Sequence, residues 1–299
     1  MIVMNRKKTI KIIFTLGLIT YLLKKLDLDA VYSTFIGMNL ELLALSFPFI
    51  GLMYSIKTKK WQILLDCIDI KIPFYNALKI ILIGTFYGAL TPGRFGELSR
   101  SFYLKADKSK TIPTVILDRI LDILCLLLLS ILSIALFFKD NNLINLLLLM
   151  IILFISGIVA LTNERFISIL FDLLNQKKAH KENYIETIDR ITGNKGVLLY
   201  TFSLSLSFYF VNLLVYWIIL KALNPMLNNI IVFSLPIITI LSNIPISISG
   251  IGVREFVSVT IFTMLNENPE YGFSFSIILY VLTILSPGLI GSLFIAEKR

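Results

Sequence analysis

The chain has few charged residues for its length. Charged residues make up 16% of its 299 residues and hydrophobic residues 57%, whereas a soluble domain is typically about 25% charged and 45–50% apolar. This composition excludes an ordinary soluble domain. It predicts an integral membrane protein.

Cysteine and histidine are equally scarce. Cys67 and Cys125 form no disulfide framework and no metal-ligand spacing, and His180 stands among lysines, where we expect it to be solvated. We find no phosphate-binding loop, zinc motif or nucleophile–base–acid set. The sequence therefore predicts no metal, no cofactor and no enzymatic activity of its own.

The basic residues are abundant and lie between apolar segments. The net charge is +9, from 28 basic and 19 acidic residues. In a soluble protein this excess would suggest nucleic acid, but here the positive-inside rule accounts for it, and we expect no nucleic-acid partner. Segment 57–79, which holds Lys57, Lys59, Lys60 and Trp61, looks amphipathic and is predicted to lie on the anionic cytosolic leaflet.

Apolar segments of spanning length recur along the chain. A spanning helix needs about 20 apolar residues. Six segments are predicted to cross the membrane: 9–23, 40–56, 112–138, 143–161, 197–220 and 273–296. Segments 77–90 and 230–248 are too short or are broken by proline, and each precedes a polar break and a second short apolar piece. We therefore expect an all-α polytopic membrane protein with six full transmembrane helices and two re-entrant helical hairpins.

The distribution of lysine and arginine orients these segments. With the N-terminus in the cytosol, 22 of the 28 basic residues lie on the cytosolic side and 4 outside, and Arg119 and Arg254 fall within membrane segments. This bias predicts a multi-pass protein of the cell membrane with both termini cytoplasmic. The order span, span, hairpin, span occurs twice with opposite orientation. It predicts one membrane domain, 1–299, built as an inverted repeat of 1–140 and 141–299.

The first polar break reads T-P-G-R-F-G-E-L-S-R, residues 91–100. Thr91 can cap the next helix. Gly93, which follows Pro92, and Gly96 have no side chain and so allow another backbone or a ligand to come close. The charged residues Arg94, Glu97 and Arg100 follow at three-residue spacing, on one helix face. A helix N-terminus beside two arginines suits a phosphate group. The alternative is that Arg94 and Glu97 form a structural ion pair and Arg100 reaches the interface.

The second break reads S-I-S-G-I-G-V-R-E, residues 247–255. Gly250 and Gly252 interrupt the helix, and Arg254 and Glu255 follow directly. Charges at membrane depth cost about 2.5–3.5 kcal/mol each and mark ion or substrate paths. We expect the two breaks to face each other across a shared site, and an ordinary interfacial turn is the alternative.

A third charged motif, D-R-I-L-D, lies inside an apolar segment. Asp118 and Asp122 are four residues apart and share a helix face, and Arg119 lies roughly 100° round the helix. Arg94, Arg100 and Arg254 are candidate partners for these carboxylates. Two interpretations remain open, a proton or cation relay and internal ion pairs that fix the first hairpin.

Together, in this order and spacing, the three motifs resemble the transmembrane region of lysylphosphatidylglycerol synthases, a flippase-like family of bacterial and archaeal membrane proteins. The resemblance covers almost the whole chain and implies a domain that moves or presents lipids across the bilayer. We expect no soluble aminoacyl-transferase domain after the last span, and so no aminoacyl transfer. The family's motif positions carry over to Pro92, Gly93, Gly96, Glu97, Arg100, Asp118, Arg119, Asp122, Gly250, Gly252, Arg254 and Glu255.

The leading hypothesis is a flippase-like transporter that moves an anionic or zwitterionic phospholipid or polyprenyl-phosphate lipid between leaflets. Its partners would be membrane lipids, and an enzyme of lipid modification or glycan assembly is a candidate. The residues assigned to lipid-phosphate binding or gating are Arg94, Glu97, Arg100, Asp118, Arg119, Asp122, Arg254 and Glu255. Two alternatives are a membrane-embedded transferase or accessory subunit acting on lipid-linked substrates, and an ion-coupled solute transporter that uses Asp118 and Asp122.

Overall fold

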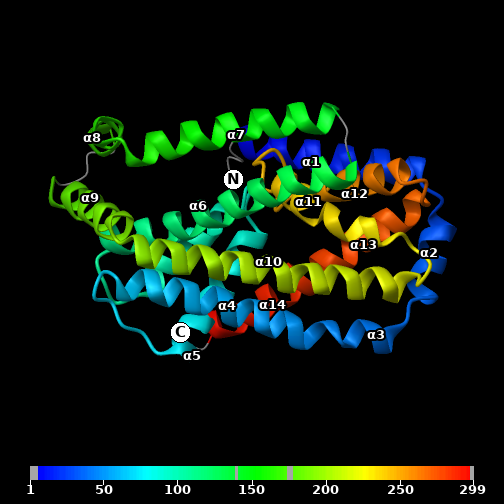
Figure 1. The fold of residues 1–299 in the computed structure, drawn as a ribbon, viewed down its shortest axis with the longest axis horizontal. Helices are drawn as coiled ribbons and strands as arrows, with labels where there is room; N and C mark the ends of the chain where they lie inside the picture. Colours follow the sequence, from blue (N-terminus) through cyan, green and yellow to red (C-terminus); the bar gives the residue numbers. More distant parts are fainter. Residues whose placement is uncertain (1–5, 139–140, 174–177, 297–299) are drawn as a thin grey trace, which may run out of the picture. The chain divides into compact units, whose positions relative to one another are not determined.

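The chain is helical throughout the part that the structure describes. This computed structural model describes residues 6–138, 141–173 and 178–296, and there the regular structure is helical except for one isolated β-bridge. The predicted all-α class is confirmed. The α-helices (Figure 1) are α1 Arg6–Lys25, α2 Leu28–Ile36, α3 Leu40–Ala44, α4 Ser46–Asp66, α5 Phe74–Ala89, α6 Lys108–Ser133, α7 Asn141–Thr162, α8 Glu164–Leu173, α9 Lys178–Gly193, α10 Lys195–Leu223, α11 Leu235–Ser242, α12 Val253–Met264, α13 Pro269–Tyr280 and α14 Ser286–Ala296.

Helical segments of other kinds complete the fold. In the described part of the chain, two are 3₁₀ helices, η1 (Phe95–Tyr103) and η3 (Asn229–Ser234), and two are π-helical turns, η2 (Ile134–Phe138) and η4 (Val281–Leu285). The π-turns continue α6 and α13 without a gap. Turns of this kind mark places where a helix departs from regular hydrogen bonding, frequently at functional sites.

The helices form two compact units that interleave along the chain. Unit 1 comprises Met1–Met53, Leu82–Glu97 and Phe210–Arg299, and unit 2 comprises Tyr54–Ile81 and Leu98–Tyr209. In unit 1, α12 packs against α13 and α11 (Figure 1), over buried Leu22, Val31, Val259 and Phe273. In unit 2, α6 packs against α9. The predicted repeat of 1–140 and 141–299 stays a prediction.

Continuous apolar helices account for much of the predicted membrane topology. Within the described residues, four helical stretches are long and apolar enough to cross a membrane: Leu40–Asp66, Lys108–Phe138, Lys195–Leu223 and Pro269–Ile295. They contain or closely match the predicted spans 40–56, 112–138, 197–220 and 273–296. The predicted spans 9–23 and 143–161 fall in α1 and α7, helices of 20 and 22 residues. These helices support a polytopic membrane protein, whereas the predicted location of the termini falls on residues outside the described ranges.

The prediction for segment 57–79 is wrong. Helix α4 continues through Lys57 and Lys60 to Asp66, and Lys60 and Trp61 are 2% and 0% exposed. A lysine can be buried when its charge is paired, and Lys60 lies against carboxylates of α6. Residues 57–66 therefore belong inside the helical bundle of unit 2 and do not form an amphipathic surface segment.

The two predicted breaks are present, and the helices that flank them are short. Helix α5 has 16 residues, about 24 Å at 1.5 Å per residue, less than the ~30 Å hydrocarbon core of a bilayer. Helices α11 and α12 have 8 and 12 residues. After the first break the chain forms the 3₁₀ helix η1, in which residues three apart are aligned. The re-entrant course of both segments stays a prediction.

Candidate functional site

The two polar breaks lie far apart in the sequence but are joined backbone to backbone in unit 1. Pro92 forms an isolated antiparallel bridge with Ile248, and the Ser249 N–H donates to the Thr91 carbonyl at 3.3 Å. Thr91 also fixes the start of η1, because its hydroxyl oxygen accepts from the Gly96 N–H at 2.7 Å. We name the residues around this bridge, 91–97 and 243–255, the break site.

Close backbone packing explains two of the glycines in the break site. A Cβ added at Gly96 would lie 2.1 Å from the Tyr87 carbonyl oxygen, and one at Gly250 would lie 2.6 Å from the Ser242 carbonyl oxygen. Real Cβ atoms do not approach so closely, and Gly250 also has a φ of 77°, a left-handed conformation that glycine adopts readily. Both breaks therefore require glycine for steric reasons.

Two non-glycine residues of the break site also have left-handed backbone. Arg94 has a φ of 54° and Ser249 a φ of 52°. Such conformations cost about 1–3 kcal/mol each and cluster at functional sites. The two strained residues stand close in sequence to the bridging residues Pro92 and Ile248, so the strain is concentrated where the breaks meet.

A buried ion pair lies at the start of α12. Arg254 and Glu255 are 5% and 4% exposed, and Arg254 Nη2 lies 2.6 Å from Glu255 Oε1. The other carboxylate oxygen of Glu255 accepts from the Gly252 N–H and so caps the helix. The Arg254 guanidinium stacks 4.4 Å from the ring centroid of Tyr280, the residue before the π-turn η4. The Glu255 carboxylate thus lies at the N-terminus of α12, where the helix dipole stabilises a negative charge.

Several hydrogen-bond donors of the break site have no hydrogen-bond partner within the described residues. They are Arg254 Nε and Nη1 and the hydroxyls of Ser247 and Ser249, all buried. A buried donor left unsatisfied costs about 1–3 kcal/mol. Donors of this number in one short segment suit a ligand that brings several acceptor oxygens.

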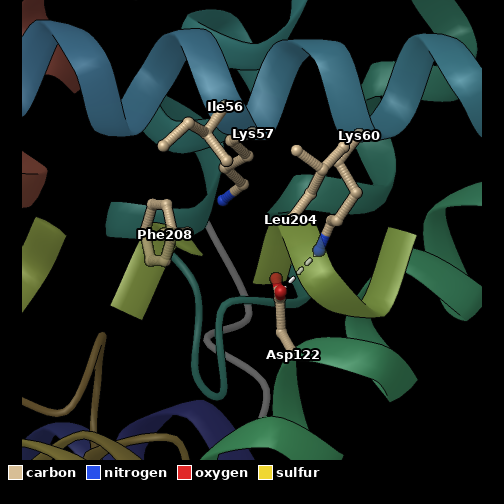
Figure 2. A pocket seen from close by; sticks show the side chains of 6 residues that line it. All are labelled: Ile56, Lys57, Lys60, Asp122, Leu204 and Phe208. Carbon is tan, nitrogen blue, oxygen red and sulfur yellow. Dashed lines mark hydrogen bonds and ion pairs between the residues drawn. The ribbon is translucent and has the colours of Figure 1, made fainter. Parts of the chain in front are cut away.

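A second buried cluster lies in unit 2, and we name it the lysine–aspartate network. Lys60 of α4 forms an ion pair with Asp122 of α6 (Figure 2) and places its Nζ 2.8 Å from Asp118 Oδ1. Ser205 of α10 donates to Asp122 Oδ1 at 2.9 Å. The predicted shared face of Asp118 and Asp122 is confirmed, because both carboxylates meet one lysine.

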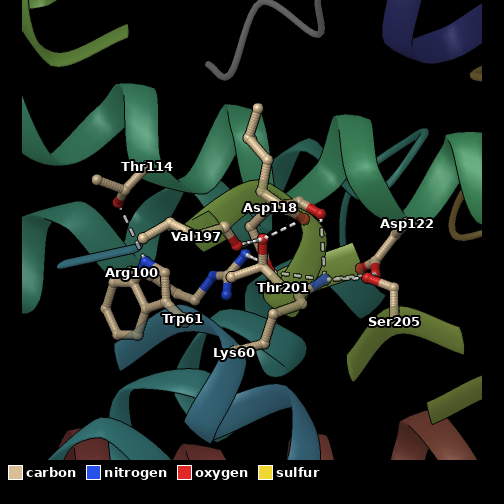
Figure 3. A network of polar contacts seen from close by, with 10 residues as sticks. Lys60, Trp61, Arg100, Thr114, Asp118, Asp122, Val197, Thr201 and Ser205 are labelled. Carbon is tan, nitrogen blue, oxygen red and sulfur yellow. Dashed lines mark hydrogen bonds and ion pairs between the residues drawn. The ribbon is translucent and has the colours of Figure 1, made fainter. Parts of the chain in front are cut away.

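Arg100 completes this network from η1 (Figure 3). Its Nη2 lies 2.8 Å from Asp118 Oδ2, and both side chains are fully buried. The guanidinium also lies 5.2 Å from the centre of the Trp61 ring, and the Trp61 indole N–H donates to Thr114 at 3.2 Å. Asp118 therefore contacts two cations. This geometry matches the interpretation of these carboxylates as internal ion pairs.

Sequence reasoning finds some of these contacts and misses others. Arg100 is a predicted partner of Asp118, and the structure joins them. Arg94 and Glu97 belong to unit 1, whereas Arg100 and Asp118 belong to unit 2, so a single cluster of all four residues stays a prediction. Arg119 is half-buried on α6. The missed residues are Lys57, Lys60, Trp61, Ser205 and Tyr280.

A usable signal for Lys60 is present in the sequence. Lys57, Lys60 and Trp61 follow residues 52–56 with no proline or glycine between them, so the helix has no reason to stop at residue 56. Continuing it places Lys57 and Lys60 one turn apart on one face.

Among the described residues, no three histidine, cysteine or acidic side chains gather into a group that would hold a metal ion.

Outside the spans, α6 begins with a defined cap. Asp107 accepts from the Ser109 N–H at 2.9 Å. This hydrogen bond holds the pKa of the Asp107 carboxyl below its usual range. The cap fixes where α6 begins, and α6 carries Asp118 and Asp122.

Comparison with known proteins supplies the family. The family model described as "Lysylphosphatidylglycerol synthase TM region" matches residues 8–291. A similar protein, UPF0104 membrane protein MJ1595 of Methanocaldococcus jannaschii, is 23% identical over 95% of this chain and 93% of its own length. UPF0104 membrane protein MJ1078 of the same organism is 25% identical over 72% of this chain and 95% of its own length. The chain therefore belongs to the lysylphosphatidylglycerol synthase transmembrane-region family.

Proposed function

We propose that this protein moves a phosphate-bearing lipid between the two leaflets, with the lipid phosphate bound at the break site. One observation carries the proposal: where the two breaks meet, Arg254 is buried with two guanidinium N–H groups unbonded within the described residues. A guanidinium fork matches phosphate oxygens. The buried Ser247 and Ser249 hydroxyls would add two donors of the same kind.

The ion pair with Glu255 supplies a way to bind and release such a cargo. Without ligand, the Glu255 carboxylate neutralises Arg254 and caps α12. A lipid phosphate that enters the site replaces the carboxylate as the partner of Arg254, and the carboxylate returns when the lipid leaves. Arg254 then keeps an anionic partner throughout, which avoids the cost of an unpaired charge in a membrane.

In the topology that we propose, the break site lies within the bilayer. The segments on either side of the bridge are α5 with η1, and α11 with α12, and they enter the membrane as re-entrant hairpins from opposite sides. The acyl or polyprenyl chains stay in the bilayer while the phosphate is held between the breaks. Both termini lie in the cytoplasm, as the distribution of basic residues favours.

The lysine–aspartate network weighs against the two alternatives. A coupling cation would need Asp118 and Asp122 as ligands, but Lys60 already lies against both carboxylates. A transferase that used either carboxylate as a base would need it near a substrate hydroxyl. Asp118 is instead fully buried and paired with Arg100 and Lys60.

Reconstitution into vesicles separates the three functions. The purified protein is incorporated into liposomes containing fluorescent phosphatidylglycerol, phosphatidylethanolamine or a labelled polyprenyl phosphate, and lipid accessibility to a membrane-impermeant quencher is followed. We expect at least one lipid to move faster than in protein-free liposomes, with no donor substrate added. Product formation that requires a donor would identify a transferase, and solute uptake without lipid movement would identify a solute transporter. Either result would overturn the proposal.

A further inference from the structure

Helix α8 packs on the protein with one side and exposes apolar side chains on another. Ile167 of α8 is buried against Tyr184 and Ile188 of α9. Phe166 and Ile169, by contrast, are 47% and 66% exposed. Residues three apart lie on one face of a helix, so these two apolar side chains form one exposed strip. We name Phe166 and Ile169 the α8 strip.

Polar side chains border the α8 strip. Arg165 is exposed and lies one turn before Ile169 on the same face. On the other side of the helix, Ser168 accepts a hydrogen bond from Lys181 Nζ of α9 at 2.8 Å. This arrangement is typical of a helix that lies in a membrane interface, because the apolar face enters the acyl region while a long basic side chain reaches the phosphate layer.

The packing of α8 and α9 places both beside the polar end of α6. Helix α9 packs against α6, and Asn183 of α9 donates to Asp107 Oδ2, at the start of α6, at 3.2 Å. Ile116 of α6 packs against the cluster that contains Ile167. The apolar run of α6 begins at Ile112, so Ile116 lies four residues, about 6 Å, inside it. An interfacial helix buries its apolar face about 5–10 Å into the headgroup–acyl boundary, and α8 lies at a matching depth.

Helix α8 is also turned away from the direction of α7. In Figure 1, α7 runs lengthwise and α8, at its end, is seen nearly end-on. Asn163, between them in the chain, accepts from the Arg165 and Phe166 N–H groups at 2.9 and 3.3 Å and so caps α8. On α7, Leu148 and Ile152 are 52% and 64% exposed, as expected of a helix surrounded by lipid. A helix that turns across the end of such a helix runs along the membrane surface.

We propose that α8 is an interfacial helix, with the α8 strip inserted among the lipid chains of the leaflet that surrounds the start of α6. The leaflet is the occupant because α8 contacts α7, whose own exposed surface is apolar at Leu148 and Ile152. A second copy of the chain would need to bury about 1,200–2,000 Å² for a stable interface, which two side chains do not provide. This inference goes beyond the proposed function and does not depend on lipid movement.

The depth of spin labels in the membrane tests this placement. Both native cysteines are replaced by serine, and a nitroxide is attached to Phe166→Cys or Ile169→Cys in the full-length protein, in vesicles of phosphatidylcholine and phosphatidylglycerol. Ile152→Cys, on an exposed position of α7, is the reference for the acyl region. Glu186→Cys, on an exposed position of α9, is the reference for water. Collision rates with oxygen, which concentrates among the acyl chains, and with a water-soluble nickel chelate give the depth of each label.

The α8 strip occupies exposed positions, so a label there replaces no core contact, and unfolding temperatures verify that each labelled protein is folded. We expect both strip labels to lie about 5–10 Å below the headgroup–acyl boundary, between the readings at residues 152 and 186. Readings equal to that at residue 186 would overturn the inference, because the strip would then face water. Low collision rates with both reagents would also overturn it. Spin–spin broadening that rises with protein density would then identify a second copy as the occupant, and its absence would identify another part of the same chain.

Discussion

Lys60 of α4 and Asp118 of α6 lie 2.8 Å apart, Nζ to Oδ1, and both side chains are almost completely buried. Each stands in a helix long and apolar enough to cross a membrane. Lys60 also pairs with Asp122, so a single lysine ties two carboxylates of one helix to a neighbouring helix. Removing one member of such a buried group leaves the others uncompensated, which is more costly than never having buried them.

Replacing Lys60 by methionine should therefore destabilise the protein strongly. We expect a loss of about 3–5 kcal/mol, because Asp122 would keep, among the described residues, only the hydrogen bond from Ser205. Lys59→Met, on the exposed side of the same helix, should change stability little. Thermal unfolding in detergent compares the two. Lys60→Met with the stability of Lys59→Met would show that the network is not structural.

The double variant Lys60→Met/Asp122→Asn refines this test. It removes the charge of both partners and should recover part of the loss seen for Lys60→Met, because no uncompensated charge stays at residue 122. A double variant as unstable as the sum of the single variants would argue against a direct coupling between these side chains.

A methyl group at Gly96 should disrupt the break site. The added Cβ would lie 2.1 Å from the Tyr87 carbonyl oxygen, so the start of η1 would have to move away from the end of α5. We expect Gly96→Ala to unfold at a clearly lower temperature or to accumulate poorly. Gly17→Ala is the control, since no atom beyond the neighbouring backbone of its own helix lies within 4 Å of a Cβ built there, and alanine favours a helix by about 1 kcal/mol over glycine. Equal stability of the two variants would contradict the close approach.

The Asp107 cap of α6 should have a measurable, pH-dependent effect. Asp107→Ala is expected to cost about 1 kcal/mol, and Asp107→Asn much less, because asparagine also caps helices. The pKa of Asp107 is lowered by the hydrogen bond from the Ser109 N–H. Its stabilising charge is thus present above the unfolded-state pKa, about 3.9, and is lost as the pH falls through the lower folded-state value.

Unfolding temperatures measured between pH 7 and the acid limit of the protein check this sign. The advantage of the wild type over Asp107→Asn should shrink as the pH falls below about 4. An advantage that grows on acidification would contradict the lowered pKa.

The topology is tested by labelling single cysteines in whole cells, after Cys67 and Cys125 are replaced by serine. A membrane-impermeant maleimide should react with Glu267→Cys, in the loop before α13, and should not react with Arg299→Cys. The predicted distribution of 22 cytosolic basic residues to 4 outside becomes 19 to 4 when Lys57, Lys59 and Lys60, which lie in the helix Leu40–Asp66, are left out. This bias still predicts the stated labelling pattern. The reverse pattern would invert the proposed orientation.

Much of the fold could be predicted because hydrophobic runs and helix breakers act locally. The apolar runs in 112–138 and 197–220 form helices, and the breaks at Gly93–Gly96 and Gly250–Gly252 lie where the glycines and prolines predict them. The contact between Pro92 and Ile248 is expected only from the paired arrangement of the breaks. It depends on tertiary packing, which local pattern does not specify.

The site is harder to predict because lysine usually lies at the protein surface, whereas here it lies among the helices. Lys57 and Lys60 look like a cytosolic flank in the sequence, and only the distant carboxylates Asp118 and Asp122 make Lys60 stable inside the protein. Similarly, Arg254 of α12 stacks on Tyr280 of α13, and nothing in the local sequence of either helix predicts this contact. Pairing across distant segments is therefore visible only in the structure.

The decisive measurement for lipid binding at the break site is the rate of lipid movement by Arg254 variants. Wild type, Arg254→Gln, Arg254→Lys and the control Arg190→Gln, whose side chain is 47% exposed in unit 2, are reconstituted at equal density. Their unfolding temperatures are measured alongside. We predict that Arg254→Gln slows lipid movement at least about tenfold, that Arg254→Lys recovers part of the rate, and that Arg190→Gln matches wild type. A folded Arg254→Gln protein that moves lipid at the wild-type rate would contradict phosphate binding by Arg254.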